Sequence, residues 1–332
     1  MESASVLEEC LLDEQVASYQ MAGEQGSIQV LSPTRPDIDL VGWATQNRDW
    51  LTGMLHTHGA ILLRGFAKSS PFAFNRFIRA TSTQWAPYRE PATPRTKVFG
   101  NIYTSTEYPA EHEIPLHNEN SHCTSWPTKI YFMCVQPSQS GGQTHFADCR
   151  RILRHIPQDV LDGFIQRKWL YIRNFGSGMA FTWQKVFATD SRADVEAYCQ
   201  QNGMDYTWAE NDTLRVRYTR EAIKYHPVTG EALWFNHGLS FNPVSLPPEV
   251  RDSLLQDASI DELAYNSFYG DGAPIEPEVL ELLIDAHRKE TRYFNWQAGD
   301  ILMLDNMLVA HGRMPFAGDR LILAGMSDSY PV

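Results

Sequence analysis

Two short segments, Pro115-Leu-His-Asn-Glu-Asn-Ser-His122 and Asp305-Asn-Met-Leu-Val-Ala-His-Gly-Arg-Met-Pro-Phe316, decide how this 332-residue chain must fold. In an extended strand, residues i and i+2 point the same way, so His117 and Glu119 can both face one point. A third ligand has to come from elsewhere in the fold, and His311 follows an apolar strand candidate. Two imidazoles and one carboxylate form the ligand set of a mononuclear non-heme iron(II) centre with open positions. The sequence therefore predicts that the two segments meet at a metal site.

The rest of the chain is rich in short apolar and aromatic segments separated by Gly, Pro, Asn or Asp. Such segments suit an antiparallel double sheet better than alternating βαβ units. Helical periodicity occurs as well, and Gly59 is well placed to end the first helix. We predict a single domain over 1–332 of mixed α and β structure, in which helices buttress a jelly-roll core. The expected strands are 60–65, 97–103, 129–135, 144–147, 169–174, 213–219, 232–237, 300–304 and 320–326, and the expected helices are 41–58 and 276–289.

Two parts of the chain are expected to differ from this core. About the first 30 residues are acidic and weakly patterned, so we expect them to be loosely attached. Residues 175–272 are rich in Trp, Tyr and Asn and lie between core strands, which is typical of a lid and substrate wall. The candidate substrate contacts there are Trp183, Trp208, Asn236 and Tyr269. Structural aromatic packing or turn formation is at least as good an interpretation of each.

Composition excludes several classes of protein. The formal net charge of -12 and the absence of clustered Lys and Arg argue against a nucleic-acid substrate. The N-terminus lacks the basic start and apolar stretch of a signal peptide, and no apolar run approaches the ~20 residues that span a bilayer, so we expect a cytoplasmic protein. The five cysteines contain no Cys-x-x-Cys pair, which predicts reduced, mostly buried thiols. Nothing in the sequence predicts an oligomeric state.

A His-x-acid pattern alone is weak, because it arises readily by chance in a chain with 11 His and 40 acidic residues. Further elements strengthen it. Arg320 begins an apolar strand nine residues after His311, and a guanidinium can bind the distal carboxylate of 2-oxoglutarate with two hydrogen bonds. Thr144 follows the glycine turn Gly141-Gly142 and offers a hydroxyl to the same carboxylate. Taken singly, these residues would be read as a surface arginine and as plain strand content.

Together these segments resemble the TauD/TfdA family of iron(II)/2-oxoglutarate-dependent dioxygenases, and within it the SyrP-like group of natural-product biosynthesis. The resemblance runs from about residue 60 to 326 and implies a double-stranded β-helix, a cupin-like jelly roll. It implies that His117, Glu119 and His311 bind the metal and that Thr144 and Arg320 contact 2-oxoglutarate. The matching blocks are 105–109, 117–119, 126–127, 141–144, 234–236, 269–272, 299–300, 305–306 and 311–320.

Two departures from the family pattern affect these assignments. Many relatives have Asp where this chain has Glu119, which keeps the ligand charge and adds one methylene of reach. The spacing from His311 to Arg320 is shorter than in the taurine-type branch, so Arg313 is the fallback for the carboxylate contact. Halogenating relatives replace the acid by a small residue, so Glu119 favours oxygen-atom chemistry.

The resemblance implies an enzyme that uses iron(II), 2-oxoglutarate and O2 to oxidise an amino-acid-like substrate, free or bound to an acyl or peptidyl carrier protein. Hydroxylation is the default expectation, and epoxidation, desaturation or cyclisation are accessible from the same oxidant. An acidic carrier would need a basic patch on this acidic enzyme. Its candidate residues, which could equally form a solvated helix face, are Arg76, Arg79, Arg150, Arg151 and Arg154.

Three alternatives stay open on the sequence. A catabolic oxygenase of small sulfonates or aryloxy acids would share the machinery. A zinc hydrolase could use the same two histidines and one carboxylate. A non-catalytic jelly-roll binding protein would need neither iron nor 2-oxoglutarate.

Overall fold

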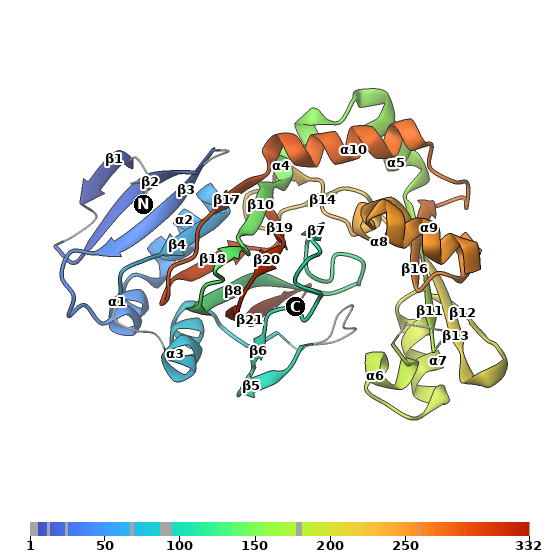
Figure 1. Cartoon of the computed structure of the whole chain (residues 1–332), viewed down its shortest axis with the longest axis horizontal. Coiled ribbons are helices and arrows are strands. Elements are labelled where there is room, and N and C mark those ends of the chain that lie inside the picture. The colour runs from blue at the N-terminus through green and yellow to red at the C-terminus, as the bar shows by residue number, and fades with distance from the viewer. Residues whose placement is uncertain are drawn as a thin grey trace.

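A nine-stranded sheet with strand order β1-β2-β3-β4-β18-β8-β21-β6-β5 runs through the molecule (Figure 1). The computed structural model describes residues 6–11, 14–23, 26–66, 70–86, 95–176, 181–257 and 259–331. Neighbouring strands are antiparallel, except that β3 and β4 are parallel. The strands are β1 (Val6–Leu11), β2 (Val16–Gly23), β3 (Gly26–Pro33), β4 (Ala60–Leu63), β18 (Ile301–Asp305), β8 (Trp126–Gln136), β21 (Leu321–Tyr330), β6 (Ile102–Thr104) and β5 (Lys97–Phe99).

The N-terminal strands belong to this sheet. β2 and β3 pair along their whole length, and β3 adds to β4. Val16, Val30 and Leu31 are fully buried. The expectation of loose attachment is therefore wrong for residues 16–23 and 26–30, because their apolar side chains contribute to the core.

Three helices cover one face of the large sheet: α1 (Leu40–Gln46), α2 (Arg48–His58) and α3 (Pro71–Thr81). The sequence predicted one helix over 41–58. The chain breaks at Asn47, where the backbone N–H and the side-chain amide both donate to the carbonyl oxygen of Trp43. The predicted end at Gly59 is confirmed, since this residue has the left-handed φ of 73° that glycine adopts without strain.

A smaller sheet packs on the face of the large sheet opposite these helices, and the two sheets enclose a shared apolar core. Its strand order is β17-β10-β19-β7, with bounds β17 (Arg292–Phe294), β10 (Thr144–Asp148), β19 (Val309–Arg313) and β7 (Ile114–His117). His311 lies in the middle of β19, and its neighbours along the strand are buried on both sides. The short strands β9 (Ser140–Gly141) and β20 (Phe316–Ala317) pair beside this sheet.

A third sheet, in the order β12-β13-β11-β16, lies at the end of the molecule opposite the N-terminal strands (Figure 1). Its strands are β12 (Asp205–Trp208), β13 (Leu214–Arg220), β11 (Trp169–Phe175) and β16 (Tyr265–Tyr269). Aromatic side chains fill its core. The remaining elements are α4 (Cys149–His155), α5 (Gln158–Arg167), α6 (Trp183–Phe187), α7 (Arg192–Gln201), η1 (Glu210–Asp212), β14 (Lys224–Tyr225), β15 (Ala232–Leu233), α8 (Gly238–Phe241), η2 (Pro243–Ser245), α9 (Pro248–Asp257), η3 (Ile260–Glu262) and α10 (Pro277–Glu290).

Three predicted strands are shorter than expected. The segment 60–65 is a strand only over Ala60–Leu63. The segment 97–103 turns at Gly100 and forms β5 and β6 instead of one strand. The segment 232–237 is a strand only over Ala232–Leu233, because the Trp234 N–H donates to the carbonyl of Cys149 on α4 and draws the chain away.

The observed architecture confirms the prediction of a mixed α and β chain with large antiparallel sheets. Within the described residues, no helix is long and apolar enough to cross a membrane. The side chains of Cys123, Cys134, Cys149 and Cys199 are buried, as predicted.

Candidate active site

The three predicted metal ligands lie together between the two facing sheets. His117 at the end of β7 and His311 in β19 are register partners, and their ring centroids are 4.6 Å apart. Glu119 lies two residues beyond the end of β7, and one ligand atom from each of the three residues lies within 4.8 Å of the others. Because Asn118 points away and donates to the Asn306 carbonyl at 2.6 Å, the i and i+2 side chains face the same point.

Both histidines are in the form that binds a metal. The carbonyl oxygen of Pro115 accepts from Nδ1 of His117 at 2.8 Å, which leaves the Nε2 lone pair for a ligand. Burial lowers the pKa of His117, although the Glu119 carboxylate opposes the shift, and burial together with His117 lowers the pKa of His311 well below 6.5. Neutral imidazoles beside a carboxylate fit iron(II).

Arg95 and Asn306 bind Glu119, although the sequence predicted a role for neither. Nη2 of Arg95 lies 2.7 Å from Oε2 of Glu119, and both side chains are largely buried. The side chain of Asn306 accepts from the Glu119 N–H at 2.8 Å and donates to the carbonyls of Glu119 at 2.9 Å and Pro127 at 2.8 Å. The pair Asp305-Asn306 was part of the family resemblance, so its presence was a signal, but its role depends on contacts over 187 residues of chain.

A second group, His56, His226 and Asp305, also brings ligand atoms within 4.8 Å of one another. Its hydrogen bonds oppose a metal. Nδ1 of His226 accepts from the N–H groups of Val228 and Thr229, so the neutral ring carries its proton on Nε2 and donates it to Asp305 at 3.1 Å. Nε2 then has no lone pair to offer, and we interpret this cluster as structural.

The predicted 2-oxoglutarate contacts line a small cavity beside His117 and His311. Thr144 in β10 accepts from Nε1 of Trp296 at 3.2 Å, and Nε of Arg320 donates to the Gly142 carbonyl at 3.0 Å. Within the described part of the chain, no carboxylate forms an ion pair with Arg320. Burial lowers the pKa of Arg320 to about 10, so the guanidinium is still charged at neutral pH. The site thus presents a partly buried cation that an anionic ligand would neutralise.

The fallback residue Arg313 lines the same cavity but is already engaged. Its guanidinium donates to the carbonyls of Tyr108 at 2.9 Å, Pro109 at 2.6 Å and His112 at 2.6 Å. These bonds anchor the loop before β7. Arg320 is therefore the better candidate for the distal carboxylate.

Glycines make room for this arrangement. Gly142 has a φ of 71°, and a Cβ there would lie 2.5 Å from Oγ of Ser138 and 3.0 Å from Cδ and Nε of Arg320. A Cβ on Gly141 would lie 2.1 Å from the Pro315 carbonyl oxygen. The Gly-Gly turn is thus required both by its backbone conformation and by the close approach of Arg320.

The four predicted substrate contacts lie elsewhere. Trp183 and Trp208 pack edge to face with ring centroids 5.2 Å apart. Trp183 is buried in the core of the third sheet, and Trp208 is partly buried against that core. Tyr269 donates to Glu276 at 2.8 Å, and Asn236 is buried and donates to the Ala222 carbonyl. None of them lines the cavity at the candidate metal site, so the structure favours the structural interpretation of each.

A cavity of about 190 Å³ lies at the candidate metal site instead, with both His117 and Glu119 in its wall. Burial lowers the pKa of His237 to about 3, so this wall residue is neutral. The remaining wall is mixed polar and aromatic and includes Tyr108, Glu113, Asn120, His122, Phe241 and Tyr265. Composition had not distinguished these aromatic residues from those in the core.

The five arginines proposed as a basic patch do not form one surface. Arg76 and Arg79 lie on α3, whereas the other three lie on α4, well apart in Figure 1. Arg150 pairs with Asp148 at 2.7 Å, and Arg151 pairs with Glu290 at 2.9 Å.

Comparison with known proteins agrees with this geometry. Residues 27–326 match the family described as taurine catabolism dioxygenase TauD, TfdA family. The chain is similar to the dapdiamide synthesis protein DdaC of Enterobacter agglomerans, with 36% identity over 84% of this chain and 85% of that protein. It is also similar to the clavaminate synthase-like protein At3g21360 of Arabidopsis thaliana, with 29% identity over 84% of each chain.

Solved structures show the same fold. PvcB of Pseudomonas aeruginosa superposes with a TM-score of 0.59 at 17% identity, covering 96% of this chain and 94% of that one. The chain is a dioxygenase. It belongs to the TauD/TfdA family.

Proposed function

We propose that this dioxygenase oxidises an amino-acid-like substrate, free or bound to a carrier protein, in natural-product biosynthesis, with hydroxylation as the default reaction. Iron(II), 2-oxoglutarate and O2 are its cofactor and cosubstrates. The names of its relatives support the setting: DdaC is a dapdiamide synthesis protein, and PvcB is described as an Fe, alpha-ketoglutarate dependent oxygenase from an isonitrile synthetic pathway. A third relative, 25% identical over 61% of this chain, is an isocyanoethenyl-indole synthase of Fischerella ambigua.

His117, Glu119 and His311 would bind iron(II), and Arg320 and Thr144 would bind the distal carboxylate of 2-oxoglutarate. When bound, the iron and 2-oxoglutarate supply the activation of O2 and the oxidation of the substrate. The protein supplies position and seclusion. Phe132 on β8 packs against His311 with ring centroids 5.3 Å apart and gives the cavity an apolar wall there. Glu119 occupies the ligand position that halogenating relatives leave to chloride, which favours oxygen transfer.

The observation that carries the proposal is the proximity of the His117, Glu119 and His311 cluster to Arg320. Both belong to one small region between the sheets, where His117, His311, Thr144 and Arg320 line the same cavity. A zinc hydrolase would require the triad but would leave the partly buried guanidinium of Arg320 without a use. This difference favours 2-oxoglutarate chemistry.

We further propose the finer architecture. The large sheet and the β17-β10-β19-β7 sheet would be the two halves of a double-stranded β-helix, since they face each other across the site residues and share one core. Residues 175–272 would form the substrate wall, because Ser240, Phe241 and Tyr265 reach the cavity at the triad.

Mass spectrometry tests the function. Candidate amino acids, free and carrier-bound, are incubated with enzyme, iron(II) and 2-oxoglutarate, with and without O2. A gain of one oxygen that requires iron(II), 2-oxoglutarate and O2 supports hydroxylation or epoxidation, and loss of two hydrogens indicates desaturation or cyclisation. Turnover of small sulfonates or aryloxy acids instead would establish the catabolic alternative. Activity with zinc in the absence of O2 and 2-oxoglutarate would establish the hydrolase.

A further inference from the structure

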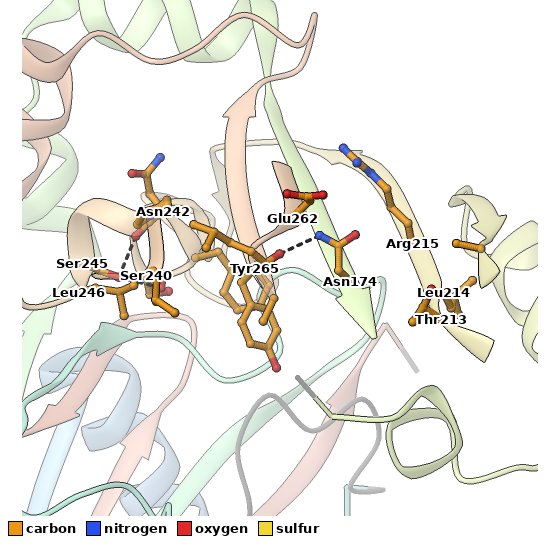
Figure 2. Close-up of a pocket in the computed structure, with 16 residues that line it drawn as sticks. Asn174, Thr213, Leu214, Arg215, Ser240, Asn242, Ser245, Leu246, Glu262 and Tyr265 are labelled. Carbon is orange, nitrogen blue, oxygen red and sulfur yellow. Dashed lines mark hydrogen bonds between the residues drawn. The ribbon is translucent and has the colours of Figure 1, made fainter. Parts of the chain in front are cut away.

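A second and larger cavity adjoins the one at the candidate metal site. It has a volume of about 690 Å³ and lies between the third sheet and the segment from α8 to β16 (Figure 2). Residues that line both cavities form a common wall. They are Ser240, Phe241, Ser245, Leu246 and Tyr265. A ligand that passes this wall would reach from the triad into the larger cavity.

The sizes of the two cavities differ in a way that bears on the substrate. Sites for small molecules usually have about 300–1,000 Å³. The cavity at the triad, at about 190 Å³, falls below this range, whereas the adjoining one, at about 690 Å³, falls within it. A free amino acid would occupy the smaller cavity and leave the larger one unused.

The larger cavity suits a chain with few hydrogen-bonding demands. Much of its wall is apolar, with Leu214, Pro243, Leu254 and Leu263 among its lining residues. Several of its polar side chains already bind the protein. Asn174 donates to the carbonyls of Asp261 and Leu263, and Ser245 donates to those of Ser240 and Asn242.

Charge in this cavity comes from Arg215 and Glu262, which Figure 2 shows on either side of Asn174. Arg215 lies 3.5 Å from Asp261, and Glu262 accepts from the backbone N–H of Ser259 at 2.8 Å. Both charges thus have partners within the fold. The wall therefore offers contact area more than strong ionic recognition.

We propose that the substrate has two parts, an amino-acid-like head at the triad and a long acyl or amide extension in the larger cavity. This inference rests on the proposed function and narrows its substrate class. The extension belongs either to the pantetheine arm of a carrier protein or to a free amide-linked molecule, and both present a mainly apolar chain interrupted by amides.

Helix α9 offers a matched pair of variants for the test. Leu254 lines the cavity, whereas its neighbour Leu255 is 39% exposed and is not among the lining residues. Leu254→Trp would fill the cavity, and Leu255→Trp would place the same bulk on the outside. Ala264, which directly precedes β16, also lines the cavity, so Ala264→Met is a second filling variant in case Leu254→Trp is poorly folded.

Calorimetry of the enzyme loaded anaerobically with iron(II) and 2-oxoglutarate measures binding of three probes for each of a set of amino acids. The probes are the free amino acid, its stable pantetheine amide and a dipeptide of similar length. We expect at least one extended probe to bind wild type ten or more times tighter than its free amino acid does. Because Leu254→Trp overpacks the cavity, it should weaken the binding of that extended probe about tenfold. Leu255→Trp should bind the probe within about twofold of wild type. Preference for the pantetheine amide assigns the carrier arm, and preference for the dipeptide assigns the free molecule.

Free amino acids that bind as tightly as every extended form would overturn the inference. So would extended probes that bind Leu254→Trp and Ala264→Met as they bind wild type, or that do not bind wild type at all. Failure of the proposed function shows separately, as the absence of 2-oxoglutarate-dependent O2 consumption with every probe. Melting temperature and 2-oxoglutarate affinity of each variant establish that only the larger cavity was changed.

Discussion

Replacing Arg320 by alanine should weaken the binding of 2-oxoglutarate while leaving the metal site intact. Nε of Arg320 donates to the Gly142 carbonyl at 3.0 Å, and the guanidinium lies over the Phe316 ring at 5.5 Å from its centroid. These contacts orient the guanidinium. Its two Nη groups form no ion pair with a carboxylate of the described residues. The free edge of the guanidinium is therefore available for two parallel hydrogen bonds to a ligand carboxylate.

The magnitude follows from burial. Removing one partner of a buried ion pair costs about 3–5 kcal/mol, because the other charge stays uncompensated. Because the Arg320 side chain is only half-buried, the lower end of this energy range applies. About 3 kcal/mol corresponds to a loss of roughly a hundredfold in affinity. Arg320→Lys keeps the charge but loses the fork, and it should lose about tenfold.

The assay is anaerobic calorimetric titration of 2-oxoglutarate into metal-loaded wild type and variants, with metal affinity measured in parallel. Arg313→Lys serves as the control, since Arg313 is committed to three backbone carbonyls and its loss should lower the melting temperature more than the 2-oxoglutarate affinity. An Arg320→Ala variant that binds 2-oxoglutarate within about threefold of wild type would refute the assignment. A large affinity loss confined to the Arg313 variant would transfer the role to that residue.

Three further predictions test the surroundings of the site. Asn306→Ala should lower iron(II) affinity about 10–100-fold and destabilise the fold by about 1–3 kcal/mol, because it removes three bonds around Glu119 and Pro127; unchanged metal titration would contradict this. Gly142→Ala should weaken 2-oxoglutarate binding and lower the melting temperature, whereas Gly230→Ala, which has the same φ of 71° and open space around it, should only lower the melting temperature. Trp183→Ala should destabilise the protein by about 3–5 kcal/mol in chemical denaturation with KM unchanged, and a selective rise in KM would restore it as a substrate contact.

The parts of the fold that were predicted well depend on local physical rules. Gly59 ends α2 because its left-handed conformation suits glycine, and α10 begins at Pro277 because proline is tolerated in the first turn. The N-terminal strands were missed because residues 16–33 are half polar, and their burial depends on pairing with β4, about 30 residues away. Such pairing is set by the tertiary fold and leaves little trace in local composition.

The candidate site shows the same division. The alternation of side chains along a strand was enough to place His117 and Glu119 together. It could not reveal Arg95, which reaches Glu119 across 24 residues, or distinguish Trp183 and Trp208 in the core from Tyr265 at the cavity. Aromatic composition reports that a segment buries large surfaces, but which rings face a ligand depends on the packing of whole sheets.

The connection between β19 and β21 explains the short spacing from His311 to Arg320. In the sequence, this connection and the Gly141-Gly142 turn are two separate motifs. Between β19 and β21 the chain pairs with the glycine turn, with Phe316 opposite Gly141 and Ala317 opposite Ser140. This pairing carries the connection back across the end of β10, and the carbonyl of Gly142 then accepts from Arg320. Because the turn that precedes Thr144 also binds Arg320, the two candidate 2-oxoglutarate contacts are positioned by one backbone element. A longer connection would not improve the reach of the guanidinium unless this pairing were also changed.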